Sequence, residues 1–406
     1  MLNAVLADMD TPALNSPTSV LVVGAGPAGL VAAVTLRERG VAVRVVDELA
    51  GEDKRTYPVV IHPRTLRILE GLGVTAPLEW RGHVITHLAL YTERQRRVVL
   101  ELPAAGRTSP GAMTLPQDVL RQALLHRLSE LGVDVEWKTR LVALEQTAGQ
   151  VRCNLVRRER SESSRPEWLD VESASLESDF VVGADGVHSA VRQRLGIGWT
   201  TQGERQIFAF YDAPDPRAGC EAQLVLHESQ GNSVYPLQGQ TSRFTFQLSV
   251  GMPQAPGLTQ LRQLLASRMP WYGTDARNFE WSGSAEFHPA LAERFGEGRV
   301  WLAGDAAHST GPLGGQSLNV GIHEAHDLAR RMADQVGHAG TSPLGVGYTH
   351  QRLLEWRVLF GLGSSEPMAP RARDWVKRNL AMLLQALPAA GDDLDDLLDQ
   401  LHVRAA

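Results

Sequence analysis

The feature that most constrains this chain is a glycine-rich turn between two apolar segments near its start. Residues 19–23 form an apolar run that is typical of a buried parallel strand. The turn GAGPAG at 24–29 follows at once and leads into a helix-compatible stretch at 30–36. A second apolar strand, 41–46, ends in Asp47. This order predicts a dinucleotide-binding strand, turn, helix and strand unit, and with it a parallel α/β sheet.

Each glycine of the turn has its own task in holding a pyrophosphate. Gly24 permits the tight turn, Gly26 lets backbone N–H groups approach the phosphates, and Gly29 lets the helix pack closely on the strand. The Asp47 carboxylate can accept hydrogen bonds from ribose hydroxyls. An ordinary strand-to-helix turn is the alternative, and the combination of glycines with the terminal acid argues against it.

Two further glycine-centred motifs follow apolar strands much later in the chain. They are GADG at 183–186 and GDAAH at 304–308, and the second is followed by PLGG at 312–315. Adjacent glycines let the backbone approach a flat ring. A helix that begins near Ser317 would direct the positive end of its dipole at that ring. The alternative for Gly304 and Asp305 is a plain strand end with a helix cap.

Composition and charge indicate a small-molecule enzyme rather than a nucleic-acid or membrane protein. The 406 residues carry a net charge of -6, which gives no basic footprint for nucleic acid. We find no apolar run long enough for a membrane span. Cys153 and Cys220, both in strand-like surroundings, predict core packing rather than a disulfide. A reducing, cytoplasmic location and a small-molecule partner are the simplest expectations.

The residue patterns predict an α/β fold in which an antiparallel sheet interrupts the nucleotide-binding domain. Short strands separated by turn residues fill 206–250, which is typical of an antiparallel sheet. Amphipathic segments at 117–131 and 317–332 predict helices. The predicted division is 1–18 for a flexible N-terminal tail, 19–82, 112–200 and 288–365 for the nucleotide-binding domain, 83–111 and 201–287 for the inserted β-sheet domain, and 366–406 for C-terminal helices.

Together, these motifs resemble the flavoprotein monooxygenases of the p-hydroxybenzoate hydroxylase type, the single-component group A enzymes. The resemblance covers roughly residues 19–365. It implies a Rossmann-like FAD-binding domain with an inserted antiparallel β-sheet substrate domain and C-terminal helices. It also implies FAD as cofactor, with NADH or NADPH and O2 as co-substrates. In this family a flavin C4a-hydroperoxide transfers one oxygen atom to an aromatic or polyketide-like small molecule, most often as a hydroxylation.

The resemblance assigns roles residue by residue. The cofactor-binding residues that it implies are Gly24, Gly26, Ala28, Gly29, Asp47, Glu48, Arg64, Gln117, Asp185, Gly304, Asp305, Pro312, Gly314, Gly315, Gln316, Ser317, Leu318 and Asn319. His188 and Arg192 stand where some members place NAD(P)H contacts. Pro312, Gly314 and Arg55 are the implied catalytic residues beside the reacting ring.

Three positions depart from the family pattern. Ser317 stands where the family usually has glycine, which adds a hydroxyl group near the ring. Glu324 stands where the family often has aspartate. Glu48 replaces an arginine that many relatives carry after the ribose-binding acid, which disfavours the extra phosphate of NADPH. The choice between the two nicotinamides therefore stays open.

Aromatic and basic residues on the inserted strands are the candidate substrate contacts. They are Tyr211, Tyr235, Arg243 and Phe246. Such groups could stack on an aromatic ring and orient a phenol or carboxylate, and ordinary sheet packing is the alternative for each of them.

Four histidines could be proposed as metal ligands, and we expect them to be surface residues instead. They are His62, His288, His323 and His326. Because no set of cysteines or carboxylates completes a site around them, we predict no metal.

Two other functions stay open at this point. The chain could be an FAD-dependent dehydrogenase, reductase or oxidase that acts on a ring substrate without oxygen transfer, because the flavin-binding residues would be shared. It could also be a non-catalytic flavin-binding protein, although the intact glycines and Asp305 argue against this. We expect a monomer or homodimer, in which the C-terminal helices could pair.

Overall fold

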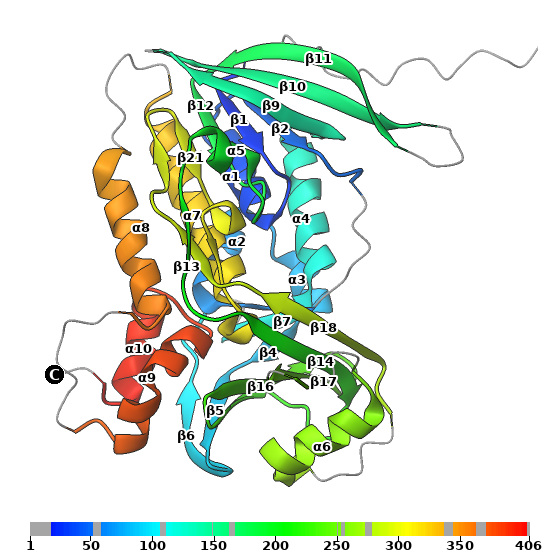
Figure 1. Cartoon of the computed structure of the whole chain (residues 1–406), viewed down its shortest axis with the longest axis vertical. Coiled ribbons are helices and arrows are strands. Elements are labelled where there is room, and N and C mark those ends of the chain that lie inside the picture. Colours follow the sequence, from blue (N-terminus) through cyan, green and yellow to red (C-terminus); the bar gives the residue numbers. More distant parts are fainter. Residues whose placement is uncertain are drawn as a thin grey trace, which may run out of the picture.

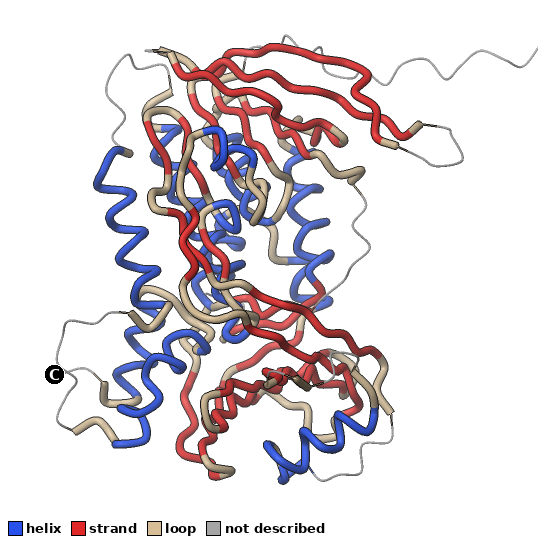
Figure 2. Tube along the Cα trace, in the orientation of Figure 1, coloured by secondary structure: helices blue, strands red, loops and turns tan. Residues whose placement is uncertain are grey.

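The computed structural model describes residues 18–51, 58–105, 111–147, 149–161, 167–249, 251–252, 256–272, 278–336, 344–362 and 371–403. Its helices and sheets confirm the predicted α/β fold (Figures 1 and 2). Arg55 lies outside the described residues, as does nearly all of the predicted tail. The division into domains stays a prediction.

A six-stranded sheet brings the three glycine motifs together. The strands follow one another in the order β20 (Gly296–Glu297), β21 (Val300–Leu302), β12 (Phe180–Gly183), β1 (Val20–Val23), β2 (Val43–Asp47) and β8 (Val135–Trp137). All neighbours pair in parallel except β20 and β21. Val23 pairs with Gly183, which pairs with Leu302. Because parallel strands end at the same edge of a sheet, the motifs after β1, β12 and β21 converge there.

Three helices pack side by side against this sheet. They are α4 (Gln117–Glu130), α1 (Pro27–Glu38) and α7 (Gln316–Ala333), with α1 in contact with both of the others. Residues 29–36 of α1 are all buried, as expected for a helix enclosed on every side. A separate antiparallel sheet of β9 (Thr139–Gln146), β10 (Val151–Arg160) and β11 (Trp168–Ser178) lies at the top of Figure 1.

A seven-stranded sheet forms the lower part of the molecule in Figure 1. Its order is β18 (Trp281–Phe287), β14 (Gln206–Pro214), β17 (Thr241–Leu248), β16 (Gln230–Leu237), β15 (Glu221–His227), β5 (His87–Thr92) and β6 (Gln95–Glu101). Strands β15 and β5 pair in parallel and the other neighbours antiparallel. Helix α6 (Leu258–Arg268), which the sequence reading did not identify, shares an apolar core with one face of this sheet.

The remaining elements connect these parts. A small sheet contains β3 (Pro58–Ile61), β7 (Ala112–Pro116) and β4 (His83–Ile85), and another contains β13 (Trp199–Thr201), β19 (Ala290–Ala292) and β22 (His308–Ser309). The other helices are α2 (Pro63–Gly71), α3 (Ala76–Arg81), α5 (Ala190–Arg194), α8 (Gly345–Leu359), α9 (Asp374–Ala386) and α10 (Asp392–Gln400). Single turns of 3-10 helix are η1 (Pro270–Tyr272), η2 (Gly304–Ala306) and η3 (Leu313–Gly315).

Three predictions about single side chains are wrong, those for Cys220, His62 and His323. Cys153 is buried, and burial raises the pKa of its thiol to about 12, but Cys220 is exposed rather than packed in the core. His62 and His323 are buried, although surface positions were predicted for them, because both lie where α2 and α7 pack together.

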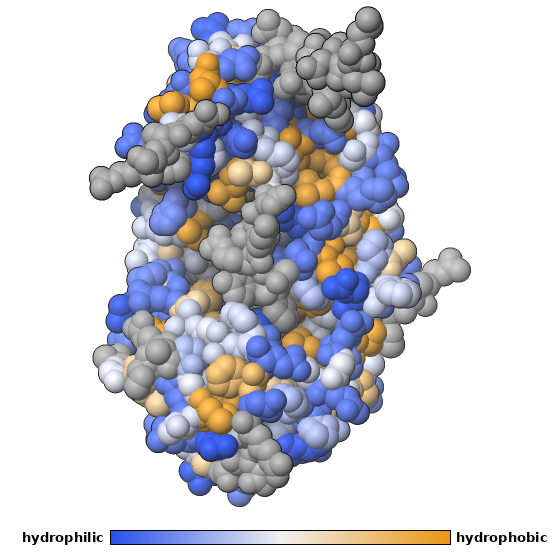
Figure 3. Space-filling view, turned by 90° about the vertical axis from the view of Figure 1, so that its right-hand side faces the viewer, coloured by the Kyte–Doolittle hydropathy of each residue, from blue (hydrophilic) through white to orange (hydrophobic). Residues whose placement is uncertain are grey.

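The visible surface is mixed in character. Figure 3 shows polar residues over much of one face, with smaller apolar groups between them. None of the helices in the described part of the chain is both long and apolar enough to cross a membrane.

Candidate cofactor and substrate site

The first glycine turn is closed on one side and open on the other. Gly24 has a φ of 106°, and a Cβ atom there would overlap the carbonyl oxygen of Ala184; a Cβ at Gly29 would overlap the carbonyl oxygen of Gly24. At Gly26, in contrast, a Cβ would meet nothing within 4 Å. Helix α1 begins after Gly26 without a described side-chain cap, so its first N–H groups stay available. This cradle suits a pyrophosphate.

Asp47 fixes the turn from the end of β2. Its Oδ2 accepts a hydrogen bond of 2.7 Å from the backbone N–H of Ala25, and its Oδ1 accepts one of 2.8 Å from Leu49. Each carboxylate oxygen keeps a second lone pair for another donor. The residue therefore has a structural role in addition to the predicted contact with ribose, which stays a prediction.

The middle motif contains a carboxylate, that of Asp185, with one oxygen that accepts no hydrogen bond from the described residues. Asp185 Oδ2 accepts a hydrogen bond of 3.1 Å from the backbone N–H of Val191, at the start of α5. Its Oδ1 has no hydrogen-bond partner among the described residues. Burial raises the pKa of this carboxyl group, against the effect of hydrogen bonds with Ser189 and nearby backbone. An orphaned buried oxygen of this kind fits a cofactor hydroxyl group as donor.

The two NAD(P)H candidates differ in availability. His188 is exposed on the cavity wall. Arg192 donates from Nη1 to the Ala306 carbonyl at 2.8 Å and from Nη2 to the Val187 carbonyl at 2.7 Å. Its guanidinium lies 3.9 Å from the ring centroid of Trp199. Arg192 therefore ties the middle motif to the third one, and only His188 remains free to approach a nicotinamide.

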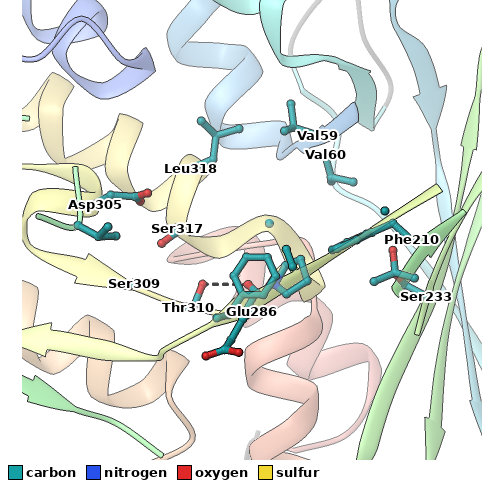
Figure 4. Close-up of a pocket in the computed structure, with 18 of the residues that line it drawn as sticks. Val59, Val60, Phe210, Ser233, Glu286, Asp305, Ser309, Thr310, Ser317 and Leu318 are labelled. Atoms are coloured by element: carbon teal, nitrogen blue, oxygen red, sulfur yellow. Dashed lines mark hydrogen bonds between the residues drawn. The ribbon is translucent and has the colours of Figure 1, made fainter. Parts of the chain in front are cut away.

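The third motif presents Asp305 to a large cavity. Although the side chain is exposed to the cavity, protein surrounds it, and this desolvation raises the pKa of the carboxyl group. His308 and a hydrogen bond with Ser317 act in the opposite direction. Figure 4 shows Asp305 and Ser317 on the same side of the cavity. Helix α7 begins directly after Gly315, without a described side-chain cap, so its positive end lies at this wall.

The loop between η3 and α7 divides into two sets of residues. Pro312, Gly315, Ser317 and Leu318 line the cavity. The contact with FAD predicted for Gly314, Gln316 and Asn319 stays a prediction, and all three residues are buried on the other side of the loop. The reason is packing against segments far away in the sequence.

The buried set holds the loop in shape. A Cβ at Gly314, which has a φ of 70°, would lie 2.9 Å from the backbone of Ala386 in α9. Gln316 Nε2 donates to the Leu387 carbonyl at 2.7 Å. Asn319 Nδ2 donates to the Val60 carbonyl at 2.7 Å. The predicted catalytic role of Gly314 stays a prediction beside this supporting role.

His62 fastens the same loop from the start of α2. Its Nε2 donates to the Gly314 carbonyl at 2.6 Å, and its backbone N–H donates to Asn319 Oδ1 at 2.8 Å. Donation from Nε2 leaves Nδ1 unprotonated, and this buried atom has no partner among the described residues. Burial lowers the pKa of the imidazole to about 4. His62 is therefore neutral at physiological pH.

This buried imidazole predicts acid sensitivity. The unfolded chain takes up a proton at His62 near pH 6.5 and the folded chain near pH 4. The contribution of His62 to the free energy of unfolding is therefore complete above pH 6.5, and it falls as the pH drops through this window. The expected loss is about 3 kcal/mol at pH 4. His62→Gln, which keeps a donor for Gly314 but cannot titrate, should show a shallower pH dependence in urea unfolding at pH 7, 6 and 5. Equal slopes for the two proteins would contradict this assignment.

The remaining predicted cofactor contacts lie outside the cavity lining as the described residues define it. Ala28 lies beside Gly304, and a Cβ atom added at Gly304 would lie 2.9 Å from the Cβ atom of Ala28. The Glu48 side chain is 64% exposed and lies 3.9 Å from Arg158 Nη1. Arg64 packs beside Gly391, and Gln117 is the first residue of α4. Contact of these residues with FAD stays a prediction.

The cavity joins the flavin motifs to the seven-stranded sheet. It has a volume of about 910 Å³. Figure 4 shows Phe210 and Ser233 of the sheet on the side opposite Asp305. Two predicted substrate contacts, Tyr235 and Arg243, line the same wall. The lining also includes Trp281 and Phe287, aromatic residues that the sequence reading did not identify.

The other two predicted substrate contacts lie on the far face of the sheet. Tyr211 and Phe246 are buried in the core that includes α6, and the Tyr211 hydroxyl donates to Gln260 Oε1 at 2.8 Å. Neither residue lines the cavity, and their contact with substrate stays a prediction. Side chains alternate between the two faces of a strand, so Phe246, three residues after Arg243, must face away from it.

A buried network that the sequence did not reveal supports the third motif. Glu324 Oε2 accepts hydrogen bonds from His308 Nε2 at 2.8 Å and from the backbone N–H of Gly304 at 3.2 Å. Its Oε1 accepts one of 2.7 Å from Trp356 Nε1 in α8. The Trp356 ring stacks on His308 with centroids 3.9 Å apart. Glu324, in α7, therefore joins η2, β22 and α8 behind the Asp305 loop.

Comparison with known proteins is consistent with this site. The model of a family described as FAD binding domain matches residues 17–358. The 6-methylpretetramide 4-monooxygenase of Streptomyces rimosus is 30% identical over 79% of this chain and 56% of its own length. The pentachlorophenol 4-monooxygenase of Sphingobium chlorophenolicum is 27% identical over 87% of this chain and 65% of its own length. This chain thus spans less than two thirds of either relative.

A solved structure shows the same fold over nearly the whole chain. The p-nitrophenol 4-monooxygenase from Pseudomonas putida DLL-E4 superposes with a TM-score of 0.68 at 21% identity. The match covers 96% of this chain and 99% of that one.

Proposed function

The chain belongs to the family of this FAD-binding domain, that of the FAD-dependent aromatic monooxygenases, and we propose that it hydroxylates an aromatic or polyketide-like small molecule with NADH or NADPH and O2. The observation that carries the proposal is the cavity between the flavin motifs and the aromatic wall of the seven-stranded sheet. In that cavity a substrate would lie next to the cofactor. The names of the two curated relatives, which concern a polycyclic and a chlorinated phenolic compound, support the substrate class.

The residues present fit FAD. The open position at Gly26 and the uncapped start of α1 suit the pyrophosphate, and Asp47 and Asp185 keep acceptor atoms for hydroxyl groups. Pro312, Gly315 and Ser317 line the part of the cavity where the flavin ring would lie. When bound, FAD supplies the redox chemistry with NAD(P)H and O2.

The protein would then contribute position, charge and exclusion of water. The positive end of α7 stabilises negative charge at the part of the ring that it faces. Phe210, Trp281 and Phe287 provide an apolar, aromatic wall that limits access of water to the substrate side. Arg243 and Tyr235 offer hydrogen-bond donors that orient a substrate oxygen.

Oxygen labelling tests this function. Purified protein is loaded with FAD, mixed with NADH or NADPH and a panel of phenols and polycyclic aromatic compounds, and supplied with ¹⁸O2. The expected result is nicotinamide oxidation that accelerates with one aromatic compound, together with one labelled oxygen atom in the product. Flavin reduction by an organic compound in the absence of nicotinamide, with no label in the product, would indicate a dehydrogenase or oxidase instead.

Several finer properties are also proposals. The choice between NADH and NADPH stays open. We propose a cytoplasmic location because both cysteines are unpaired, as in a reducing compartment. We keep the predicted division into FAD-binding, substrate-binding and C-terminal parts, and a monomer or homodimer as the assembly.

A further inference from the structure

The cavity wall on the seven-stranded sheet is an ordered array of two rows of side chains. Trp281 on β18 pairs with Asp212 on β14, Asp212 pairs with Arg243 on β17, and Arg243 pairs with Tyr235 on β16. These four residues are direct cross-strand neighbours, so their side chains project from the same face. Three of them, Trp281, Arg243 and Tyr235, line the cavity, and Asp212 stands between two of these.

The second row carries no charge. Gly283 pairs with Phe210, Phe210 with Thr245, and Thr245 with Ser233. All four line the cavity. A substrate that lies on this face therefore meets a flat surface of small and aromatic residues, and the only guanidinium on the two rows is that of Arg243.

Asp212 neutralises that guanidinium. Arg243 Nε donates to Asp212 Oδ1 and Nη2 donates to Oδ2, both at 2.7 Å, in a bidentate pair. Both side chains are largely buried, with exposed fractions of 8% and 13%. The ring centroids of Trp281 and Phe210 lie 4.8 and 5.8 Å from the guanidinium carbon. Because Nη1 takes no part in the pair, Arg243 keeps both N–H groups of Nη1 as donors without offering a net charge.

The other charged groups that line the cavity do not belong to the two rows. Arg192 gives both Nη atoms to main-chain carbonyls. Asp305 and Glu286 add carboxylates to the lining, and Glu286 pairs with Arg205 at 3.1 Å and with His288 at 2.7 Å. Burial also raises the pKa of Tyr235, so its hydroxyl group stays neutral. A carboxylate that lay on the two rows would lose its hydration without gaining an unpaired cation there.

We propose that this cavity selects an uncharged, planar aromatic substrate whose hydroxyl or carbonyl oxygen accepts a hydrogen bond from Arg243 Nη1, and that Asp212 sets this preference by neutralising the guanidinium. The proposal rests on the proposed function in one respect, that the cavity is the substrate site. Ligand binding tests it without turnover, so failure of oxygen transfer and failure of this selectivity are separate results.

The test compares two ligands that differ by one carboxylate. The FAD-loaded full chain, without nicotinamide, is titrated with 2-naphthol and with 3-hydroxy-2-naphthoate, and Kd is read from the change in flavin absorbance. Wild type should bind the naphthol at least about tenfold more tightly, which corresponds to ~1.4 kcal/mol. Asp212→Asn, which frees the guanidinium charge, should bind the naphthoate at least about tenfold more tightly than wild type does, and the naphthol nearly as before.

Two further variants control the result. Asp170→Asn removes one negative charge from an exposed ion pair with Arg140 that does not line the cavity, and it should leave the ratio of the two Kd values unchanged. The double variant Asp212→Leu with Arg243→Met removes the pair without leaving an unpaired charge. It serves where Asp212→Asn fails to fold, and it should keep the preference for the naphthol with a weaker Kd.

Three results would overturn the proposal. Wild type could bind the naphthoate as well as the naphthol or better, or bind neither ligand. Asp212→Asn, shown to be folded by circular dichroism, could leave the ratio of the two Kd values as in wild type. The double variant could bind the naphthoate in preference to the naphthol.

Discussion

Gly26→Ala is expected to leave the protein folded and to weaken FAD binding by roughly ten- to hundredfold. The backbone of Gly26 has a φ of -72°, which alanine adopts without strain, and the added methyl group would meet no protein atom within 4 Å. That methyl group would fill the space through which the pyrophosphate approaches the backbone of the turn. Urea unfolding of the FAD-free protein and a fluorescence titration with FAD measure the two effects separately.

Gly24→Ala provides the matched control two residues away. Its added Cβ would overlap the Ala184 carbonyl, and alanine is strained at a φ of 106°. We expect the FAD-free protein itself to lose about 3 kcal/mol or more of unfolding free energy. If Gly26→Ala bound FAD as tightly as wild type, or lost as much stability as Gly24→Ala, the assignment of the open cradle to the cofactor would be wrong.

Glu324→Ala should strongly destabilise the protein, because Glu324 in α7 holds the segment that carries Asp305. It leaves the N–H donors of His308, Trp356 and Gly304 without their acceptor in a fully buried position. Removal of one partner from such a buried, charged cluster costs about 3–5 kcal/mol. Because the total stability of a protein is about 5–15 kcal/mol, much of the chain should unfold at low denaturant. Equilibrium unfolding in urea, followed by tryptophan fluorescence, gives the value.

Glu324→Gln should destabilise the protein less than Glu324→Ala does. The amide oxygen can accept from one of the two sides, and the amide nitrogen then faces a donor on the other. Its stability should therefore fall between those of wild type and Glu324→Ala. A Glu324→Ala protein as stable as wild type would show that the network does not hold the loop.

The convergence of the three glycine motifs could be predicted from the sequence. Each motif follows a short apolar strand, and the carboxyl ends of parallel strands meet at one edge, whatever the order of the strands. Local pattern was enough, because the signal lies in the residues that directly surround each turn. The same holds for α7, whose amphipathic pattern marked the segment 317–332 before the structure gave Gln316–Ala333.

The local sequence does not predict which residues of the third motif face the cavity and which face the interior. Ser317 faces the cavity and Gln316 faces the interior because Gln316 finds its partners at Leu387 and Ala389, some seventy residues later. The same is true of Glu324, whose partner Trp356 belongs to another helix. Distant contacts of this kind leave no mark in the local sequence.

The sequence also contains part of the information on the substrate wall. Strand alternation places Arg243 and Phe246 on opposite faces, so the two could not both contact one substrate. The leucines at 258, 261, 264 and 265 also follow a helical period and mark α6, which covers the face that Phe246 occupies. The pairing of Asp212 with Arg243 needed the register between β14 and β17.

The parallel sheet also determines when the cofactor site can form during synthesis. Val20 of β1 pairs with Phe180 of β12, and Val181 of β12 pairs with Val300 of β21. Strands that are neighbours in the sheet are therefore more than a hundred residues apart in the chain, and the later strand leaves the ribosome long after the earlier one. Such non-local pairing slows folding and leaves strand edges exposed to aggregation in the meantime. The nascent chain must carry an incomplete sheet until residues 300–333 emerge. FAD can therefore be captured only late in translation, and a chaperone that covers the exposed edge of β12 until then would protect the chain from aggregation.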